Sequence, residues 1–500
     1  MWFDPDYAEM HYKFKLPWSL LYKKEPEIII DAPFEVIPGE ETVLFIVIRE
    51  ANRFPVTLLH FEAVFTSENS CITKALSLQE EVKTPFCFKA IPCGNLPAGN
   101  YEVQASVTVQ ISNKRKRIQR YNLTGLKKKP LHIQVLQEAI PKPNGYMAGD
   151  THAHTYISAD PVEFGASPAV LQQAARSVGL DFVLCTDHSY DFAFSGEDYM
   201  VRTDASVRYQ KLREEIAELS DYPKLIAGEE VSVGNSRGQN VHLLFPGNPF
   251  FVPGEGDCGR QWLHNKPTLS IPQVVSQTEL PCFAAHPKEC MGRLERFVFR
   301  RGDWHAEDLL QNSKNPIAAL EFWNGSRDKG FELGRAFWIS ELEKGNYILP
   351  LGGNDAHGDL NEYTGVKIPL FQLKQSYAHV FGYVRTVVQG SDPLTAFRGK
   401  NLYVTDGPAL WWTRENDSVT FHFKSSKDFG KLKKLTLFAM ESASKKEAPV
   451  QAQLFQNSDY EAQVQISLDG KKYVRAEAET EFKRFALTSA CPVLPNNVRT

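Results

Sequence analysis

The sequence predicts an α/β fold in which a β/α barrel lies between two regions built from β-strands. Strand patterns without helix patterns fill the segment 27–136. Strand and helix patterns then alternate up to about residue 398, and strand patterns alone return from Gly399 onward. A length of 500 residues suits two to four domains. We therefore predict an irregular N-terminal segment (1–25), a β-sandwich (26–140), a barrel (146–398) and a C-terminal β domain or extension (399–500).

Composition and charge give no indication of a nucleic-acid or membrane partner. The hydrophobic content of 42% and the charged content of 23% are ordinary for a globular protein, and a net charge of −4 gives no sign of a nucleic-acid partner. No stretch reaches the roughly 18 apolar residues that a membrane helix needs, and the N-terminus lacks a signal-peptide profile. The eight scattered cysteines are typical of reduced thiols. We expect a cytoplasmic protein without a membrane or nucleic-acid partner, and the oligomeric state stays open.

The segment 26–140 is predicted to form an immunoglobulin-like β-sandwich. Short runs rich in β-branched and aromatic residues alternate with turn signals such as Pro38-Gly39. Its role stays open between a lid, a dimer surface and a carbohydrate contact. The basic run Lys114–Arg117 is interpreted as a solvated hairpin tip rather than a phosphate or nucleic-acid patch. The strand patterns span residues 28–30, 42–49, 56–65, 86–90, 101–111 and 131–136.

The segment 146–398 repeats the order of strand, polar residue and helix. Its first helix is predicted after Ser167, which can cap the helix, with Pro168 in the first turn and Gly179 at the end. In a β/α barrel the carboxyl ends of the strands line one mouth, so the polar residues that follow the strands should converge there. The predicted strands are 148–154, 182–185, 225–227, 241–245, 282–285, 317–320 and 347–351, with further helices over 204–219, 271–277 and 331–344.

Histidines and carboxylates gather at these strands. His152 and His154 are two residues apart, so they point to one face of a strand, where two imidazoles can bind one divalent ion. Six of the 13 histidines occupy such positions, and this concentration predicts a metal centre. The predicted cluster contains His152, His154, His188, Glu230, His242, His286, Asp355 and His357.

A cluster of this kind predicts hydrolysis by a metal-activated water. Two ions about 3.5–4 Å apart can lower the pKa of a bound water towards 7 and hold the leaving oxygen. Neither a G-x-S-x-G elbow nor a P-loop occurs, which excludes the serine-hydrolase and NTPase mechanisms. The loop 246–268 is expected to shape the pocket. Four arginines after His286 are interpreted as a solvated helix face rather than a phosphate clamp: Arg293, Arg296, Arg300 and Arg301.

The motifs at the strand ends resemble the PHP (polymerase and histidinol phosphatase) family over about Gly149–Gly358. Two flanking features, Gly399–Pro408 and the tail Tyr473–Ala478 with Ala486–Thr488, resemble the carbaryl-hydrolase-like metallohydrolase branch of that family. Five motifs in the family's order carry the resemblance: Asp150-x-His152-x-His154, Thr186-Asp187-His188, Gly228-Glu229-Glu230, Ala285-His286-Pro287 and Asp355-Ala356-His357.

The resemblance implies a distorted seven-stranded β/α barrel that binds two or three divalent ions, either Mn, Zn or Fe. Asp160 would complete the third ion's ligands, one residue past the family's usual position, where Ala159 stands. The candidate catalytic residues Asp187, Glu321 and Asn324 match family positions that support the ligands. The implied ligand sets are His152, His154, Glu230 and Asp355 for one ion, Glu230, His242 and His286 for a second, and His188 and His357 for a third.

The leading hypothesis is a phosphoesterase that acts on a small phosphate ester, because metal ions neutralise the charge that grows on phosphoryl oxygens. The first alternative is a carboxylester, amide or carbamate hydrolase, which the flanking features favour and which an arginine clamp at the site would oppose. A non-catalytic metal-binding module is the alternative from a different class. The enzyme hypotheses expect a small-molecule substrate, and the sequence does not identify it.

Overall fold

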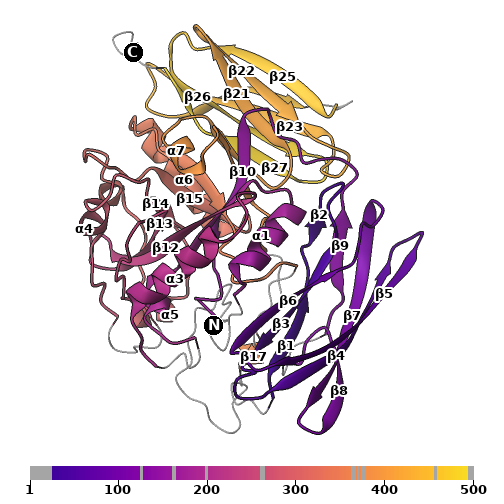
Figure 1. Cartoon of the computed structure of the whole chain (residues 1–500). Helices are drawn as coiled ribbons and strands as arrows, with labels where there is room; N and C mark the ends of the chain where they lie inside the picture. Colours follow the sequence, from indigo (N-terminus) through magenta and orange to yellow (C-terminus); the bar gives the residue numbers. More distant parts are fainter. Residues whose placement is uncertain are drawn as a thin grey trace.

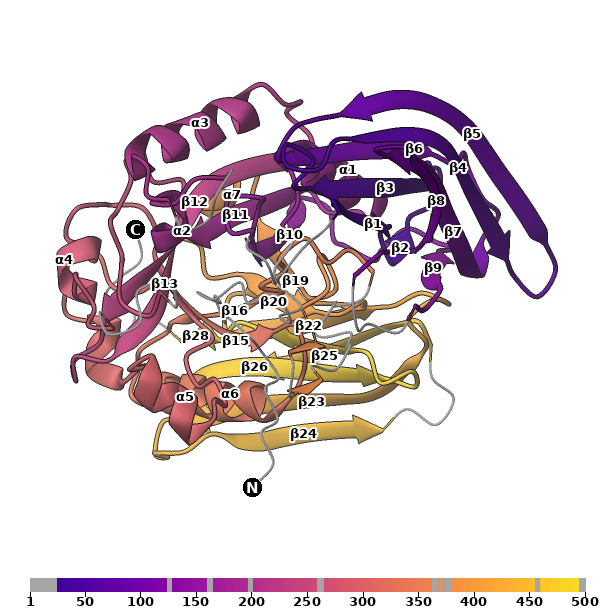
Figure 2. The same cartoon turned by 90° about the horizontal axis from the view of Figure 1, so that it is seen from below.

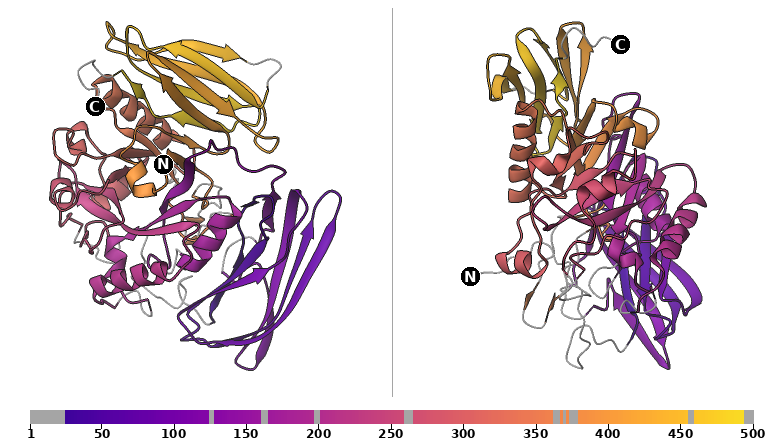
Figure 3. Two further views of the ribbon diagram at one scale, coloured as in Figure 1. Left: turned by 45° about the horizontal axis from the view of Figure 1, so that its top comes forward. Right: turned by 90° about the vertical axis from the view of Figure 1, so that its left-hand side faces the viewer.

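β-Strands are the main regular structure of this chain, and they form three parts that follow one another along the sequence (Figure 1). The computed structural model describes residues 25–123, 128–159, 165–196, 201–258, 265–361, 367–368, 371–372, 379–454 and 459–493. The N-terminal strands and the C-terminal strands lie on different sides of the central segment (Figure 3). Most of the segment 1–25, together with Asp160, lies outside the described residues.

The N-terminal part consists of two sheets packed face to face. One sheet has the strand order β1-β3-β6, and the other has the order β2-β9-β7-β4-β5 with β8 beside β7. Their shared core joins Ile46 of the first sheet to Phe61 and Val103 of the second, and all three are buried. The strands are β1 (Glu27–Asp31), β2 (Glu35–Val36), β3 (Val43–Arg49), β4 (Val56–Thr66), β5 (Cys71–Val82), β6 (Phe86–Pro92), β7 (Gly99–Ile111), β8 (Lys114–Gln119) and β9 (Leu131–Val135).

The central part forms one half of a long mixed sheet. Seven strands lie side by side in the order β16-β15-β14-β13-β12-β11-β10, and the sheet then continues through β19. Strands β11, β13 and β16 are buried along their whole length, which explains why their sequences are largely apolar without alternation. The strands are β10 (Tyr146–Ala153), β11 (Phe182–His188), β12 (Lys224–Gly234), β13 (Asn240–Pro246), β14 (Phe283–Ala285), β15 (Ala319–Asn324), β16 (Leu349–Gly353) and β19 (Arg385–Gln389), with a separate pair β17 (Lys367–Ile368) and β18 (Phe371–Gln372).

The predicted seven-stranded β/α barrel is wrong, because the strands belong to a continuous 14-stranded sheet. β10 pairs with β11 on one side and antiparallel with β19 on the other, and β13 runs antiparallel to both of its neighbours. Strand β16 lies near β10 without pairing along it: the Thr151 hydroxyl donates to the Gly352 carbonyl, and an isolated bridge, Ala153–Ala356, follows the end of β16. An alternation of strand and helix patterns does not show which strand pairs with the outer edge of the first strand. In this structure β19 pairs with that edge of β10.

The helices cover the central sheet. Helix α1 begins where the sequence predicts, with the Ser167 hydroxyl accepting from the Val170 N–H and Pro168 in the first turn. Its face packs against Phe45 of the N-terminal part. No helix among the described residues has the length and apolar character to cross a membrane. The helices are α1 (Pro168–Ser177), α2 (Ser189–Phe192), α3 (Ala205–Ala217), α4 (Ile271–Val275), α5 (Arg293–Val298), the 3-10 helix η2 (Ala306–Leu309), α6 (Lys329–Glu343) and α7 (Pro393–Ala396).

The C-terminal strands extend the central sheet and add a second layer to it (Figure 2). The order continues as β19-β20-β27-β26-β23-β24 with β28 beside β26, and the layer β21-β22-β25 packs on it. Phe421 of that layer shares a buried core with Leu435 and Val474 of the long sheet. The strands are β20 (Leu402–Thr405), β21 (Ala409–Glu415), β22 (Ser418–Lys424), β23 (Leu432–Glu441), β24 (Ala448–Leu454), β25 (Glu461–Ser467), β26 (Lys471–Thr480), β27 (Phe485–Thr488) and β28 (Cys491–Pro492).

A buried ion pair joins the N-terminal part to the central sheet. Arg385 Nη2 of β19 lies 2.5 Å from Glu35 Oε1 of β2, and both side chains are at most 2% exposed. Asn361 adds two hydrogen bonds to the backbone of His132, at 3.1 and 2.6 Å. These polar contacts fix the sandwich against the sheet that carries the clustered histidines.

Removing one partner of this pair should destabilise the fold. Arg385→Met leaves the Glu35 carboxylate buried without its cation, so we expect the free energy of unfolding to fall by about 3–5 kcal/mol in urea denaturation. The double variant Glu35→Leu/Arg385→Met should recover most of that loss. Lys83→Ala, which removes an exposed ion pair with Glu81, should change stability by less than about 1 kcal/mol. Equal effects of Arg385→Met and Lys83→Ala would contradict the structural role of the buried pair.

Candidate metal centre

Several of the predicted metal ligands lie on neighbouring strands of the central sheet. His152 lies on β10, His188 ends β11, and Glu230 lies on β12. Parallel pairing sets His188 directly beside Glu230. In the antiparallel pair β12–β13, Ser232 stands opposite His242, so His242 shares a sheet face with Glu230 two residues away.

Four donor atoms form the first group. They belong to His152, His154, Glu230 and Asp355, and all four residues are buried. The Nε2 atoms of the two histidines are 3.2 Å apart. Each lies 3.0–3.4 Å from Glu230 Oε2 and Asp355 Oδ1. Four ligands about 2.0–2.1 Å from a tetrahedral ion would be separated by about 3.3–3.4 Å, so the observed spacing fits one divalent ion.

Protons alone do not satisfy this group. Each imidazole nitrogen carries at most one proton, yet His154 Nε2 has three polar neighbours within 3.4 Å. Glu230 Oε2 is buried and has no hydrogen-bond partner, although it lies 2.9 Å from His188 Nδ1. A cation that binds all these lone pairs at once resolves both observations.

Two further groups share members with the first. One combines His188, Glu230 and His242, and the other combines His154, His188 and His357. His286 Nε2 lies 3.0 Å from Glu230 Oε1 and therefore reaches the same carboxylate. The structure thus brings together eight of the nine predicted ligands, and Asp160 is the one outside the described residues. The clusters can hold metal ions, and the number of ions is a proposal.

The buried charges of the cluster depend on one another. Burial raises the pKa of Glu230 and Asp355, but the facing histidines, chiefly His242 and His152 respectively, hold both pKa values well below the usual range. Burial lowers the pKa of His154, but the neighbouring Asp355 and Glu230 carboxylates outweigh that effect and raise it to about 9. The carboxylates therefore stay ionised, and their charge favours positive charge between them, either as protons on the imidazoles or as a bound cation.

The three candidate catalytic residues lie behind the ligands. Glu321 Oε2 is 2.8 Å from His152 Nδ1, and Asn324 Nδ2 donates to Asp355 Oδ2 at 3.1 Å. Asp187 accepts from the backbone and hydroxyl groups of Thr155, both at 2.8 Å, and from Ser158. Each of these side chains, the Asn324 amide N–H and the two carboxylates, fixes the orientation of a predicted ligand or of the loop after His154, so these residues position the cluster.

The backbone is strained at two ligands. His286 has φ 25° and Asp355 has φ 53°, and non-glycine residues rarely adopt these values. Gly353 precedes Asp355 by two residues, and a Cβ atom there would lie 2.4 Å from Glu321 Oε1 and 2.7 Å from His152 Cβ. The glycine therefore permits β16 to approach the histidine that Glu321 supports.

Sequence reasoning missed the residues behind His242 and His286. Asp257 Oδ2 lies 2.9 Å from His242 Nε2, and Glu289 Oε2 lies 3.3 Å from His286 Nδ1. Arg301 is buried and contacts both carboxylates, so its interpretation as part of a solvated helix face is wrong. Both acids lie in connections without a strand or helix pattern, and no local signal in the sequence marks them.

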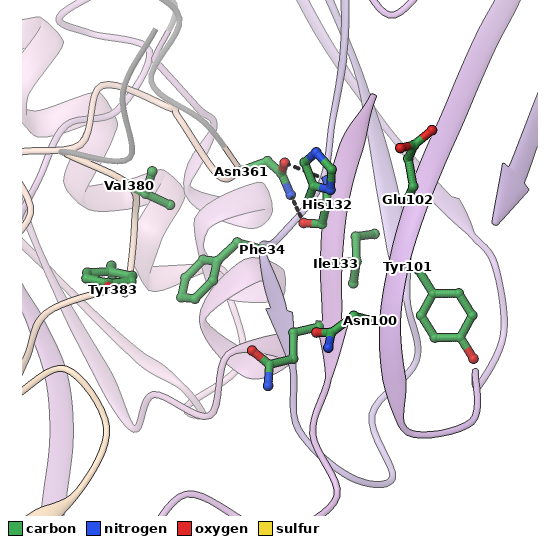
Figure 4. A pocket seen from close by; sticks show the side chains of 10 residues that line it. Phe34, Asn100, Tyr101, Glu102, His132, Ile133, Asn361, Val380 and Tyr383 are labelled. Carbon is green, nitrogen blue, oxygen red and sulfur yellow. Dashed lines mark hydrogen bonds between the residues drawn. The ribbon is translucent and has the colours of Figure 1, made fainter. Parts of the chain in front are cut away.

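A separate cavity of about 400 Å³ lies between the N-terminal part and the central sheet (Figure 4). Phe34 and Tyr383 pack against each other in its lining with ring centroids 5.7 Å apart, and Asn361 binds the backbone of His132. None of the clustered histidines or carboxylates lines this cavity. It therefore does not belong to the candidate metal centre.

Comparisons with known proteins find no matching family and only weak similarity to solved structures. No family model and no curated protein matches the chain. A Paenibacillus sp. cycloisomaltooligosaccharide glucanotransferase complexed with cycloisomaltoheptaose has 10% identity and a TM-score of 0.18 over 93% of this chain and 71% of that one. The β-glucuronidase of Parabacteroides merdae has 8% identity and a TM-score of 0.18 over 94% of this chain and 78% of that one. Similarities this low support no conclusion about fold or function.

Metal content should depend on the first group. We expect His152→Ala to lower the amount of zinc or manganese that copurifies by at least one ion per chain in elemental analysis, because it removes one of four clustered donors. His132→Ala changes an exposed histidine on β9 and should leave the metal content as in the wild type. Unchanged metal content in His152→Ala would show that this group is not a metal site.

Proposed function

We propose that this protein is a metal-dependent hydrolase with its centre at the cluster around Glu230. The observation that carries the proposal is the tetrahedral spacing of four buried donors, with Glu230 Oε2 lacking any hydrogen-bond partner. His152, His154, Glu230 and Asp355 would hold one divalent ion, and Glu230 would share a second with His188, His242 and His286. Divalent ions bound there would make water nucleophilic near neutral pH and withdraw charge from the substrate's oxygens.

The chain's own residues prepare this chemistry by holding the donors in place. Glu321 accepts from His152, so the opposite ring nitrogen faces the cluster. Asn324 binds one oxygen of Asp355 and leaves the other beside His154. Asp187 fixes the turn that follows His154 through Thr155 and Ser158. A centre fixed in this way does not have to reorganise as charge develops on the substrate.

A small phosphate ester is our first proposal for the substrate. The ions would carry most of the charge stabilisation that a phosphoryl group needs.

A carboxylester, amide or carbamate is the second proposal, and one observation favours it. Arg301, one of the four arginines considered as a phosphate clamp, contacts His242 of the cluster but is engaged by Asp257 and Glu289. A guanidinium neutralised by two carboxylates is a weak anion receptor.

A paired assay separates these possibilities. Wild type with added Mn²⁺ or Zn²⁺ should release p-nitrophenol from p-nitrophenyl phosphate or its bis ester, and the rate should fall to the uncatalysed level in the His152→Ala/His154→Ala variant or with a chelator. His132→Ala should keep the wild-type rate.

Turnover of p-nitrophenyl acetate with both phosphate esters untouched would replace the phosphate proposal by the carboxylester one. Full metal occupancy without turnover of any ester would instead support a non-catalytic metal-binding module. Turnover that persists without the two histidines would place the hydrolytic site elsewhere in the chain.

A further inference from the structure

The side of the cluster formed by His242 and His286 is backed by a chain of charges that ends on one buried arginine. Arg301 Nη1 lies 2.5 Å from Asp257 Oδ2, and Arg301 Nη2 lies 3.1 Å from Glu289 Oε2. The arginine side chain is only 4% exposed. The planar guanidinium therefore joins two carboxylates that come from two different connections, one after β13 and one after β14.

Each of these carboxylates holds the outer nitrogen of one histidine. Asp257 Oδ2 faces His242 Nε2 at 2.9 Å, and Glu289 Oε2 faces His286 Nδ1 at 3.3 Å. The inner nitrogens, His242 Nδ1 and His286 Nε2, lie 2.5 and 3.0 Å from the same atom, Glu230 Oε1. Both imidazoles thus stand between an outer carboxylate and the central one.

This arrangement fixes the orientation of each ring. A carboxylate oxygen on the outer side of each imidazole holds that edge of the ring in place. The inner nitrogens of both rings then converge on Glu230 Oε1. Two imidazole nitrogens and one carboxylate oxygen gathered in this way are suitable ligands for one divalent ion.

Arg301 is the group that holds both outer carboxylates in place, with one nitrogen on each. The Ser232 hydroxyl donates to the other Asp257 oxygen at 2.5 Å and fixes the carboxylate plane. Arg301 Nη1 also lies against His242 Nε2, and both groups meet at Asp257 Oδ2.

We propose that Arg301 is a positioning residue for the second ion, acting through Asp257 and Glu289 to orient the rings of His242 and His286. The inference rests on the proposed metal centre. It assigns to Arg301 no contact with substrate. It separates the ion held with His242 and His286 from the ion held by His152, His154 and Asp355, whose outer partners, Glu321, Ser158 and Asn324, make no contact with Arg301 among the described residues.

Zinc titration of the full chain against a chromophoric chelator tests this assignment. We expect Arg301→Gln to weaken one class of Zn²⁺ site by about 10–100-fold and to leave the other class at wild-type affinity. Asp355→Asn should show the opposite pattern. Arg301→Lys, which restores the charge but not the two-pronged geometry, should recover part of the loss. Arg117→Gln, which removes an exposed arginine–carboxylate pair with Glu62, should bind zinc as the wild type does.

Asp257→Asn provides a second variant of nearly the same shape in case Arg301→Gln does not fold. The asparagine lacks the charge and one of the two acceptor oxygens that tie Arg301 to His242, and we expect the same class of site to weaken. Wild-type affinity at every site in the folded variants, or an equal loss at both classes, would overturn the role of Arg301. A wild-type chain that binds no zinc tightly would instead refute the proposed metal centre itself.

Discussion

The Glu230 carboxylate is the constraint on which the centre of this protein depends. Five imidazole nitrogens lie 2.5–3.4 Å from its two oxygens. A buried carboxylate costs several kcal/mol of folding free energy unless nearby positive charge compensates it. The histidines supply that compensation through protons or through shared cations, so the cluster and the stability of the central sheet are linked.

The mixed direction of the sheet makes this arrangement possible. The parallel strands β10, β11 and β12 bring His152, His188 and Glu230 to one region of the sheet. Strand β13 runs antiparallel to β12 and places His242 on the same sheet face as Glu230. The outer edge of β10 pairs antiparallel with β19, and β19 pairs with β20. The same sheet therefore also carries the C-terminal strands.

The polar groups behind the ligands divide the centre into two halves. Behind His152 and Asp355 stand Glu321 and Asn324, which bind them directly. Behind His242 and His286 stand two carboxylates tied together by a guanidinium. The first half is held by separate contacts, whereas the second is one network that Arg301 joins, and this difference explains why one arginine can act on a single half of the centre.

The sequence by itself determined which histidines and carboxylates stand at the strand ends, and most of the secondary structure. The spacing of His152 and His154, the residues that end each buried strand, and the capped helix after Ser167 are local features, and local periodicity and capping govern them. The tertiary structure alone decided the sheet order, the pairing of β10 with β19, and the partners Asp257, Glu289 and Arg301. Pairing edges and buried ion pairs join residues that are distant in the chain, and their energy depends on burial and geometry that no local pattern encodes.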